Sequence, residues 1–395
     1  MNKHNFLESF EFNNGVTLRN KVVMSPMTTM ASYYNGMVTN DELDYYEMRS
    51  SGPGMIITAV ANVTNDGKGF EGELSVASDD MIPGLKKLAA IIKSNNAKAI
   101  LQIFHAGRKS NSKILRGEQP VAPSPLAAAY PANPETPREL SHDEISSIIK
   151  SFGEATRRAI ESGFDGIELH GANTYLLQQF YSENSNQRTD KWGGSREKRL
   201  TFALQVIKEV NVTIRRYATK PFIVGYRISP EEIEKPGISL EDSLYFADTI
   251  KHQVSYIHLS MGRYKRTSLN NPEDKTPILE QFSNILNGNI PLIGIGSVET
   301  PEDAENVINN GGDLVAIGRE LLREPQWVEK IQTGDLTSIR TSIIPLDLDE
   351  LKIPRVMQSY LKESFYDVMH FTTDQKANQD YQGQLTPMEG FEKKL

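Results

Sequence analysis

The sequence contains no cysteine among its 395 residues. This absence excludes disulfides, thiolate nucleophiles, zinc–thiolate sites and iron–sulfur clusters, because each of them needs cysteine sulfur. Any redox chemistry would therefore depend on an organic cofactor or on a metal bound by histidine and carboxylates.

The chain also has fewer positively charged than negatively charged residues. The chain has 43 Lys and Arg residues against 51 Asp and Glu residues, which gives a formal net charge of −8. Nucleic acids and anionic membranes attract clusters of Lys and Arg, so we expect neither of them as a partner. Apolar runs such as residues 55–63 reach about half of the roughly 20 residues that a bilayer span needs. The N-terminal segment also lacks the apolar stretch of a signal peptide, and the sequence therefore predicts a cytoplasmic protein.

In place of long hydrophobic runs, the chain has eight short ones that alternate with amphipathic segments. We predict strands at residues 21–25, 54–60, 97–104, 164–170, 222–227, 256–260, 291–295 and 313–317. Eight strands with intervening helices are typical of an α/β fold of the (β/α)₈ class, the TIM barrel. A doubly wound open sheet would need a glycine fingerprint after its first strand, and the Ser-Pro-Met at 25–27 is not one.

Helix start signals lie between these strands. Thr39 with Glu42, and Ser141 with Glu144, have the spacing of capping boxes. Thr300 is followed by a proline and two acidic residues, which is typical of the first turn of a helix.

The spacing of the strands predicts the domain organisation. The third and fourth strands are followed by longer connections than the roughly 30-residue βα unit allows. The first insertion, residues 107–140, contains six prolines, so it cannot be a helix, and we expect it to cap the barrel mouth. We predict a barrel domain over residues 1–338. Residues 339–395 would follow as a C-terminal helix over 354–369 and a flexible polar tail.

Two polar side chains interrupt or end strands that are otherwise apolar. Gln102 lies within the third strand and Arg227 ends the fifth. A buried amide costs a few kcal/mol unless it is paired, so an internal hydrogen bond or a salt bridge would account for each residue. The functional alternative is an amide that faces a flat ring, and a guanidinium that faces an anion or a charge-accepting ring edge.

A compact polar group follows the fourth strand directly. His170, Asn173 and Tyr175 lie within six residues of one another. Two donors can polarise a carbonyl oxygen and a phenol can deliver a proton, so this group is a candidate catalytic site. A lone histidine would more often be a core residue, but three such residues at one strand end favour a function. No second histidine or carboxylate lies at ligand spacing, so we expect no metal.

A separate signal indicates a phosphate site. Gly296 and Ser297 close the seventh strand, and Gly318 and Arg319 close the eighth and begin a helix. Glycines let backbone N–H groups approach a ligand, and the arginine supplies charge. Barrel phosphate sites are built from these two loops. The expected ligand therefore has a phosphate at these loops and a flat polar ring near Gln102 and Arg227. A mononucleotide flavin has both parts, and it would supply redox chemistry to a chain without cysteine.

These motifs resemble the Old Yellow Enzyme family of flavin-dependent NAD(P)H:flavin oxidoreductases and ene-reductases, from about residue 6 to residue 327. The resemblance rests on five segments in order: SPMT at 25–28, QIFHAGR at 102–108, GFDGIELH at 163–170, NQRTDKWGGS at 186–195 and DLVAIGR at 313–319. It implies a (β/α)₈ barrel with bound FMN, NADH or NADPH as reductant, and a small alkene or carbonyl substrate of the enone type.

The resemblance also assigns the flavin contacts. Pro26, Met27 and Thr28 would contact the isoalloxazine, with the Thr28 hydroxyl near O4. Gln102 would bind the pyrimidine edge, and Arg227 would stabilise negative charge at N1 and O2 of the reduced ring. The phosphate would be held by Gly296, Ser297, Gly318 and Arg319.

The same resemblance assigns the chemistry. His170 and Asn173 would bind the activating oxygen of the substrate, hydride would reach the β-carbon, and Tyr175 would donate the proton. Val60 stands where a small residue is common in the family, and it would crowd the flavin edge.

Two other functions are weighed against this one. A flavin-free barrel, such as a phosphosugar-type lyase or isomerase, would need a reactive lysine or a carboxylate pair at the strand ends, and neither is well placed. A non-catalytic flavin-binding barrel would have no need of the intact His170, Asn173 and Tyr175. A homo-oligomer is compatible with the sequence, which does not fix the oligomeric state.

Overall fold

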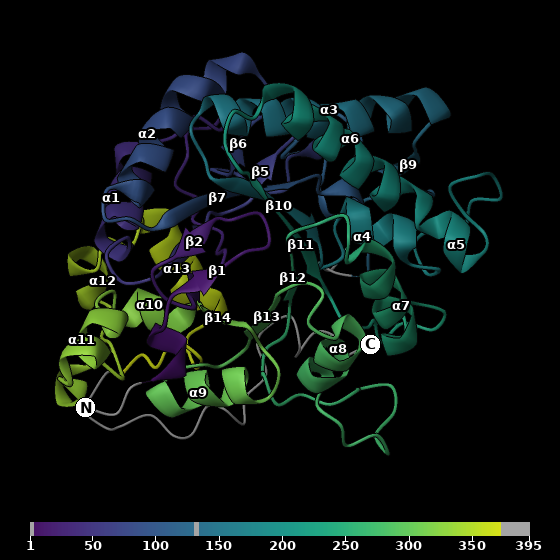
Figure 1. Ribbon diagram of the computed structural model, residues 1–395. Helices are drawn as coiled ribbons and strands as arrows, with labels where there is room; N and C mark the ends of the chain where they lie inside the picture. Colours follow the sequence, from purple (N-terminus) through teal and green to yellow (C-terminus); the bar gives the residue numbers. More distant parts are fainter. Residues whose placement is uncertain (1–3, 130–133, 373–395) are drawn as a thin grey trace.

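Figure 1 shows the computed structural model of the chain, which describes residues 4–129 and 134–372. Eight parallel strands pair in sequence order, and the ring closes because β14 pairs with β3. They are β3 (Val22–Met24), β4 (Met55–Ile57), β7 (Lys98–Phe104), β10 (Gly166–Gly171), β11 (Ile223–Ile228), β12 (Tyr256–Leu259), β13 (Leu292–Ile295) and β14 (Leu314–Ile317). Each falls on one of the eight predicted strands, so the predicted barrel is confirmed.

Helices surround the strands, as Figure 1 shows. After the first three barrel strands come α1 (Asn40–Arg49), α2 (Ile82–Lys93) and α3 (His142–Glu161). The next strands are followed by α4 (Leu176–Tyr181), α5 (Arg196–Arg199), α6 (Thr201–Tyr217), α7 (Leu240–Ile250) and α8 (Ile278–Leu286). The last two barrel strands are followed by α9 (Pro301–Asn309), α10 (Arg319–Arg323) and α11 (Trp327–Thr333). Within the described ranges, every helix is too short or too polar to cross a bilayer.

The predicted capping boxes are confirmed at one of two positions. Ser141 and Glu144 exchange both hydrogen bonds at the start of α3. At α1, the Thr39 side chain accepts the Glu42 backbone N–H, but the Glu42 carboxylate does not return to the cap. It accepts hydrogen bonds from Thr29 and Ser32 instead, at 3.1 and 2.8 Å. The prediction was wrong there because Glu42 is fully buried, and burial raises the pKa of Glu42 to about 7.

The insertion after β7 begins with a 3₁₀ turn at Gly107–Lys109. Two short strands, β8 (Val121–Ala122) and β9 (Arg138–Glu139), then pair in parallel, and the described part of the insertion contains no α-helix. Arg188 from the loop after α4 holds the insertion, because its Nη1 donates to the carbonyl oxygens of Leu140 and Pro123 at 2.7 and 3.1 Å. None of the described insertion residues lines the cavity at the ends of the barrel strands, so a capping role stays a prediction.

The segment after α11 packs onto the barrel. It contains α12 (Asp347–Glu350) and α13 (Arg355–Ser364), so the C-terminal helix is shorter than the predicted 354–369. Eight of its side chains belong to the same hydrophobic core as the barrel strands: Ile343, Leu348, Leu351, Ile353, Met357, Leu361, Met369 and Phe371. The buried guanidinium of Arg49 joins the two parts by donating to the carbonyl oxygens of Leu321 and Leu351 at 3.0 and 2.8 Å. The predicted boundary at residue 338 stays a prediction, and the predicted tail lies largely outside the described residues.

Candidate active site

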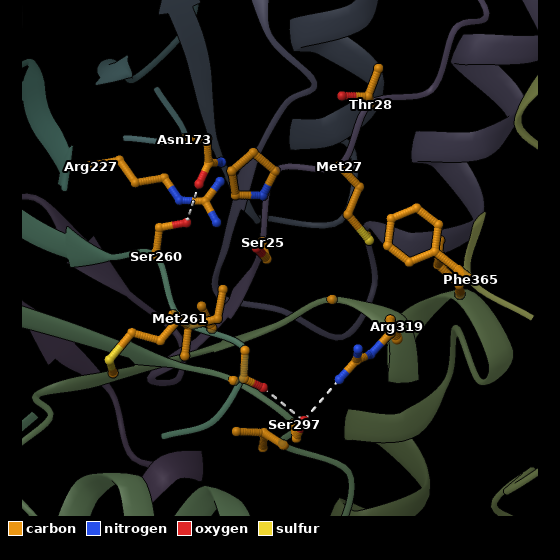
Figure 2. Close-up of a pocket in the computed structure, with 18 of the residues that line it drawn as sticks. Ser25, Met27, Thr28, Asn173, Arg227, Ser260, Met261, Ser297, Arg319 and Phe365 are labelled. Carbon is orange, nitrogen blue, oxygen red and sulfur yellow. Dashed lines mark hydrogen bonds between the residues drawn. The ribbon is translucent and has the colours of Figure 1, made fainter. Parts of the chain in front are cut away.

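A cavity opens where the barrel strands end, at the face where β3, β11, β12, β13 and β14 run into their loops. Figure 2 shows the side chains that line it. Barrel enzymes place their chemistry at this face. Nine of the thirteen predicted site residues line the cavity: Pro26, Met27, Thr28, Asn173, Arg227, Gly296, Ser297, Gly318 and Arg319. The other four, Val60, Gln102, His170 and Tyr175, are not among its lining residues.

One corner of the cavity, here called the anion corner, carries a fixed positive charge. Gly296 has a φ of +123°, and a Cβ atom there would lie 2.5 Å from the backbone nitrogen of Arg263, so only glycine fits. The Ser297 hydroxyl donates to the carbonyl oxygen of Gly262 at 2.8 Å and accepts from Nη2 of Arg319 at 2.9 Å (Figure 2). Arg319 is thereby fixed with its charge at the cavity wall, where a phosphate can be bound.

A polar network lies inside the barrel below the cavity. The fully buried carboxylate of Glu168 accepts hydrogen bonds from Gln102 Nε2 at 2.6 Å, Tyr256 at 2.9 Å and His258 Nδ1 at 2.8 Å. Tyr256 fits because Gly225 faces it, since a Cβ at Gly225 would lie 2.0 Å from the tyrosine ring. The amide hydrogen bond to Glu168 uses a donor of Gln102 and leaves its carbonyl oxygen to accept from a ligand.

The charges of this network follow from its geometry. Burial alone would raise the pKa of Glu168, but His258, Arg227 and Gln102 outweigh it and hold that pKa below its usual value. Glu168 is therefore a carboxylate. Arg227 is nearly buried, and its Nε has no hydrogen-bond partner among the described residues. An unpaired buried guanidinium nitrogen is costly, so a ligand that accepts a hydrogen bond or carries negative charge is favoured there.

His170 lies in register with Arg227 on the adjacent strand, and Arg227 in turn with His258. Burial, followed by the nearby Arg227 and His258, lowers the pKa of His170 well below its usual value of 6.5. The imidazole is therefore neutral at physiological pH. Its Nδ1 is buried without a partner among the described side chains and backbone groups, so a ligand atom is needed to satisfy it.

Asn173 is held in a left-handed turn at the end of β10, with a φ of +57°. Its backbone N–H donates to the Ser229 hydroxyl at 2.9 Å, and its side-chain oxygen accepts from the Ser260 hydroxyl at 2.9 Å (Figure 2). Because Ser260 occupies the oxygen, the Asn173 amide presents its Nδ2 hydrogens to the cavity.

Tyr175 belongs to a small aromatic group beside the cavity. Its ring centroid lies 4.8 Å from that of Phe104 and 4.9 Å from that of His170, both edge to face. Val60 packs in the same group, as does Phe70. Burial and the nearby carboxyl of Glu73 raise the pKa of Tyr175 above its usual value of 10, so the phenol keeps its proton.

Two sets of lining residues were not predicted from the sequence. Ser260, Met261 and Arg266 come from the loop after β12, which the buried carboxylate of Glu231 anchors by accepting from Arg266 Nη2 at 2.8 Å. These residue types form no motif, so nothing in the sequence marks them as cavity residues. The second set comes from α13 and its C-cap residue: Met357, Tyr360, Leu361 and Phe365. Its amphipathic spacing predicted a helix but could not say what the buried face would contact.

The residues present fit an FMN molecule. The anion corner suits its phosphate, the unpaired Arg227 suits the polar edge of its ring, and the carbonyl oxygen of Gln102 can accept the hydrogen of ring N3. Gly318 leaves space beside Met27, whose sulfur would lie 3.5 Å from a Cβ atom there. The assignment of each residue to the cofactor stays a prediction.

Comparisons with known proteins agree with this chemistry. Residues 6–337 match the family described as NADH:flavin oxidoreductase / NADH oxidase. An NADH:acrylate oxidoreductase of Vibrio harveyi is 43% identical over 328 residues, which are 82% of this chain but 33% of that protein. The probable NADH-dependent flavin oxidoreductase YqiG of Bacillus subtilis (strain 168) is 42% identical over 348 residues, 88% of this chain and 93% of that one. The solved structure of morphinone reductase superimposes with a TM-score of 0.72 at 26% identity, covering 84% of this chain and 90% of the other.

Proposed function

Because the chain belongs to the NADH:flavin oxidoreductase / NADH oxidase family, we propose that it reduces small activated alkenes of the enone type, at the expense of NADH or NADPH. The observation that carries the proposal is the convergence of His170, Asn173 and Tyr175 beside a cavity with an anion corner. When bound, FMN supplies the hydride that it has taken from the nicotinamide.

The chain's own residues bind and activate the substrate. Neutral His170 and the Nδ2 group of Asn173 are two donors for the carbonyl oxygen of an α,β-unsaturated compound. Their hydrogen bonds strengthen as negative charge develops on that oxygen, so they stabilise the enolate. Tyr175 then gives its phenolic proton to the α-carbon, since it stays protonated at neutral pH.

The name of the Vibrio harveyi relative supports an unsaturated carbonyl compound as the substrate class. The match covers about a third of that protein. For the present chain we therefore propose only the substrate class, a small unsaturated carbonyl compound. A cytoplasmic location and a homo-oligomeric state stay predictions.

The visible spectrum of the purified protein, followed by two additions, tests this function. We expect a flavin band at about 450 nm, bleaching by NADH or NADPH under anaerobic conditions, and return of the band on addition of 2-cyclohexenone. Absence of the band would favour the flavin-free barrel. Bleaching without recovery on any enone would contradict alkene reduction while leaving the flavin oxidoreductase intact.

Replacing Arg319 by alanine is expected to weaken FMN binding by about tenfold to a hundredfold. The reason is the loss of a charge-assisted contact at the corner that Arg319 shares with Ser297. The FMN dissociation constant, measured by fluorescence on the apoprotein, checks this. Arg216→Ala, which removes an exposed arginine on α6, is the matched control and should bind as the wild type does. An unchanged dissociation constant in Arg319→Ala would refute the phosphate assignment.

Ser260→Ala is expected to weaken the binding of phenolic inhibitors by about twofold to tenfold, the value of one neutral hydrogen bond. Ser260 orients the Asn173 amide, so its effect should depend on Asn173 being present. A double-mutant cycle measures this dependence: in an Asn173→Ala background, Ser260→Ala should have no further effect. Additive losses would mean that Ser260 acts on the ligand by another route.

A further inference from the structure

One wall of the cavity comes from a part of the chain that the family match does not reach. The match ends at residue 337, yet Met357, Tyr360, Leu361 and Phe365 line the same cavity as Arg227 and Arg319. Figure 2 shows the ring of Phe365 beside the side chain of Met27, above Arg319. The cavity is therefore closed on this side by the C-terminal segment.

The helix that carries these residues is firmly docked. The four side chains recur at helical spacing and so share one face of the helix and its C-cap, while Lys362 and Glu363 on the other face are exposed. Met357 and Leu361 are buried in the main core. Upstream, the Arg49 guanidinium holds the carbonyl oxygen of Leu351 at 2.8 Å. This wall is consequently a fixed part of the cavity.

The apolar side chains of this wall suit one part of the FMN molecule. Polar and charged groups of the cavity match the phosphate and the pyrimidine edge of FMN, as described above. The remaining part of the ring system, the dimethylbenzene end, is apolar, and apolar surface gains free energy by burial against apolar side chains. The face presented by α13 and by Phe365, which lies beside Met27 (Figure 2), is an apolar surface of this cavity.

We infer that α13 and Phe365 cover the dimethylbenzene end of the bound flavin and shield its carbon 8 from solvent. This inference rests on the proposed function only in that FMN occupies the cavity. A flavin covered in this way is closed to a protein electron acceptor at that end. Electrons would then leave toward small molecules bound near His170.

The test uses the full-length protein reconstituted with 8-mercapto-FMN, whose sulfur reports on carbon 8 directly. We expect iodoacetamide to alkylate the bound flavin at least about tenfold more slowly than free 8-mercapto-FMN, because a closed wall must open locally before reagent enters. Phe365→Ala should restore most of the lost rate, and Phe365→Leu, which keeps an apolar cover, should not. Lys362→Ala, on the exposed face of the same helix, should react as the wild type does.

The outcomes separate this inference from the proposed function. Wild-type alkylation as fast as that of the free flavin would overturn the inference, although FMN binding and enone reduction could both still hold. An equal acceleration in Lys362→Ala and Phe365→Ala would also overturn it, because the effect would not then depend on the wall. Failure of the wild-type apoprotein to bind any flavin would overturn the inference and the proposed function together.

Discussion

Tyr175→Phe is expected to slow the alkene-reducing half-reaction by about 10²–10⁴-fold, the usual contribution of a general acid. The substitution removes only the hydroxyl, so the ring contacts with Phe104 and His170 remain. FMN content and flavin reduction by the nicotinamide should therefore stay close to wild type. Burial and Glu73 raise the pKa of Tyr175, so the wild-type donor should not lose its proton as the pH rises to about 9.

Stopped-flow measurement of the two half-reactions, with 2-cyclohexenone as the oxidant, checks this prediction. Tyr217→Phe, which removes an exposed hydroxyl on α6, is the matched control. If Tyr175→Phe keeps the wild-type rate and solvent isotope effect, the proton comes from another source, such as water.

His170→Ala is expected to slow alkene reduction by about 10²–10³-fold, as the loss of one preorganised donor to a developing oxyanion does. Its pKa is lowered by burial and by Arg227 and His258, so it acts as a neutral donor and its contribution should not change between about pH 6 and 8. Nicotinamide oxidation should respond differently, because that substrate presents no enone oxygen at the same place.

The two half-reactions and the binding of p-hydroxybenzaldehyde distinguish this role from a structural one. His170→Asn keeps a donor and should recover part of the lost rate, while His252→Ala removes an exposed histidine and should have no effect. If His170→Ala leaves both half-reactions and phenol binding at wild-type values, His170 does not contact the substrate.

The barrel could be predicted because its strands are short apolar runs bounded by turn residues. Each of the eight predictions overlaps the observed strand, and the main differences are at the ends, where apolar residues such as Val60 continue past the last ladder hydrogen bond. Gly296 and Arg319 were also singled out from their positions at strand ends, and both line the cavity, while phosphate binding there stays a prediction.

Other parts of the site could not be predicted, because they depend on contacts between residues far apart in the sequence. For Gln102 an internal hydrogen bond was one of two alternatives, but its partner Glu168, 66 residues away, could not be named from the sequence. The wall formed by α13 has no motif, and only the folded barrel shows which cavity its apolar face meets. Glu42 satisfied the spacing of a capping box, but burial directed its carboxylate to Thr29 and Ser32.

The placement of the cavity wall has a consequence for how the protein is made. The lining residues range from Ser25 to Phe365, so a growing chain must be almost finished before the cavity has all its sides. Pairings of such large sequence separation form late in folding, since the connecting chain must first be ordered. A nascent chain that ends before Arg355 has an open cavity even when all eight strands are in place. We therefore expect the C-terminal wall to be the last side of the cavity to form.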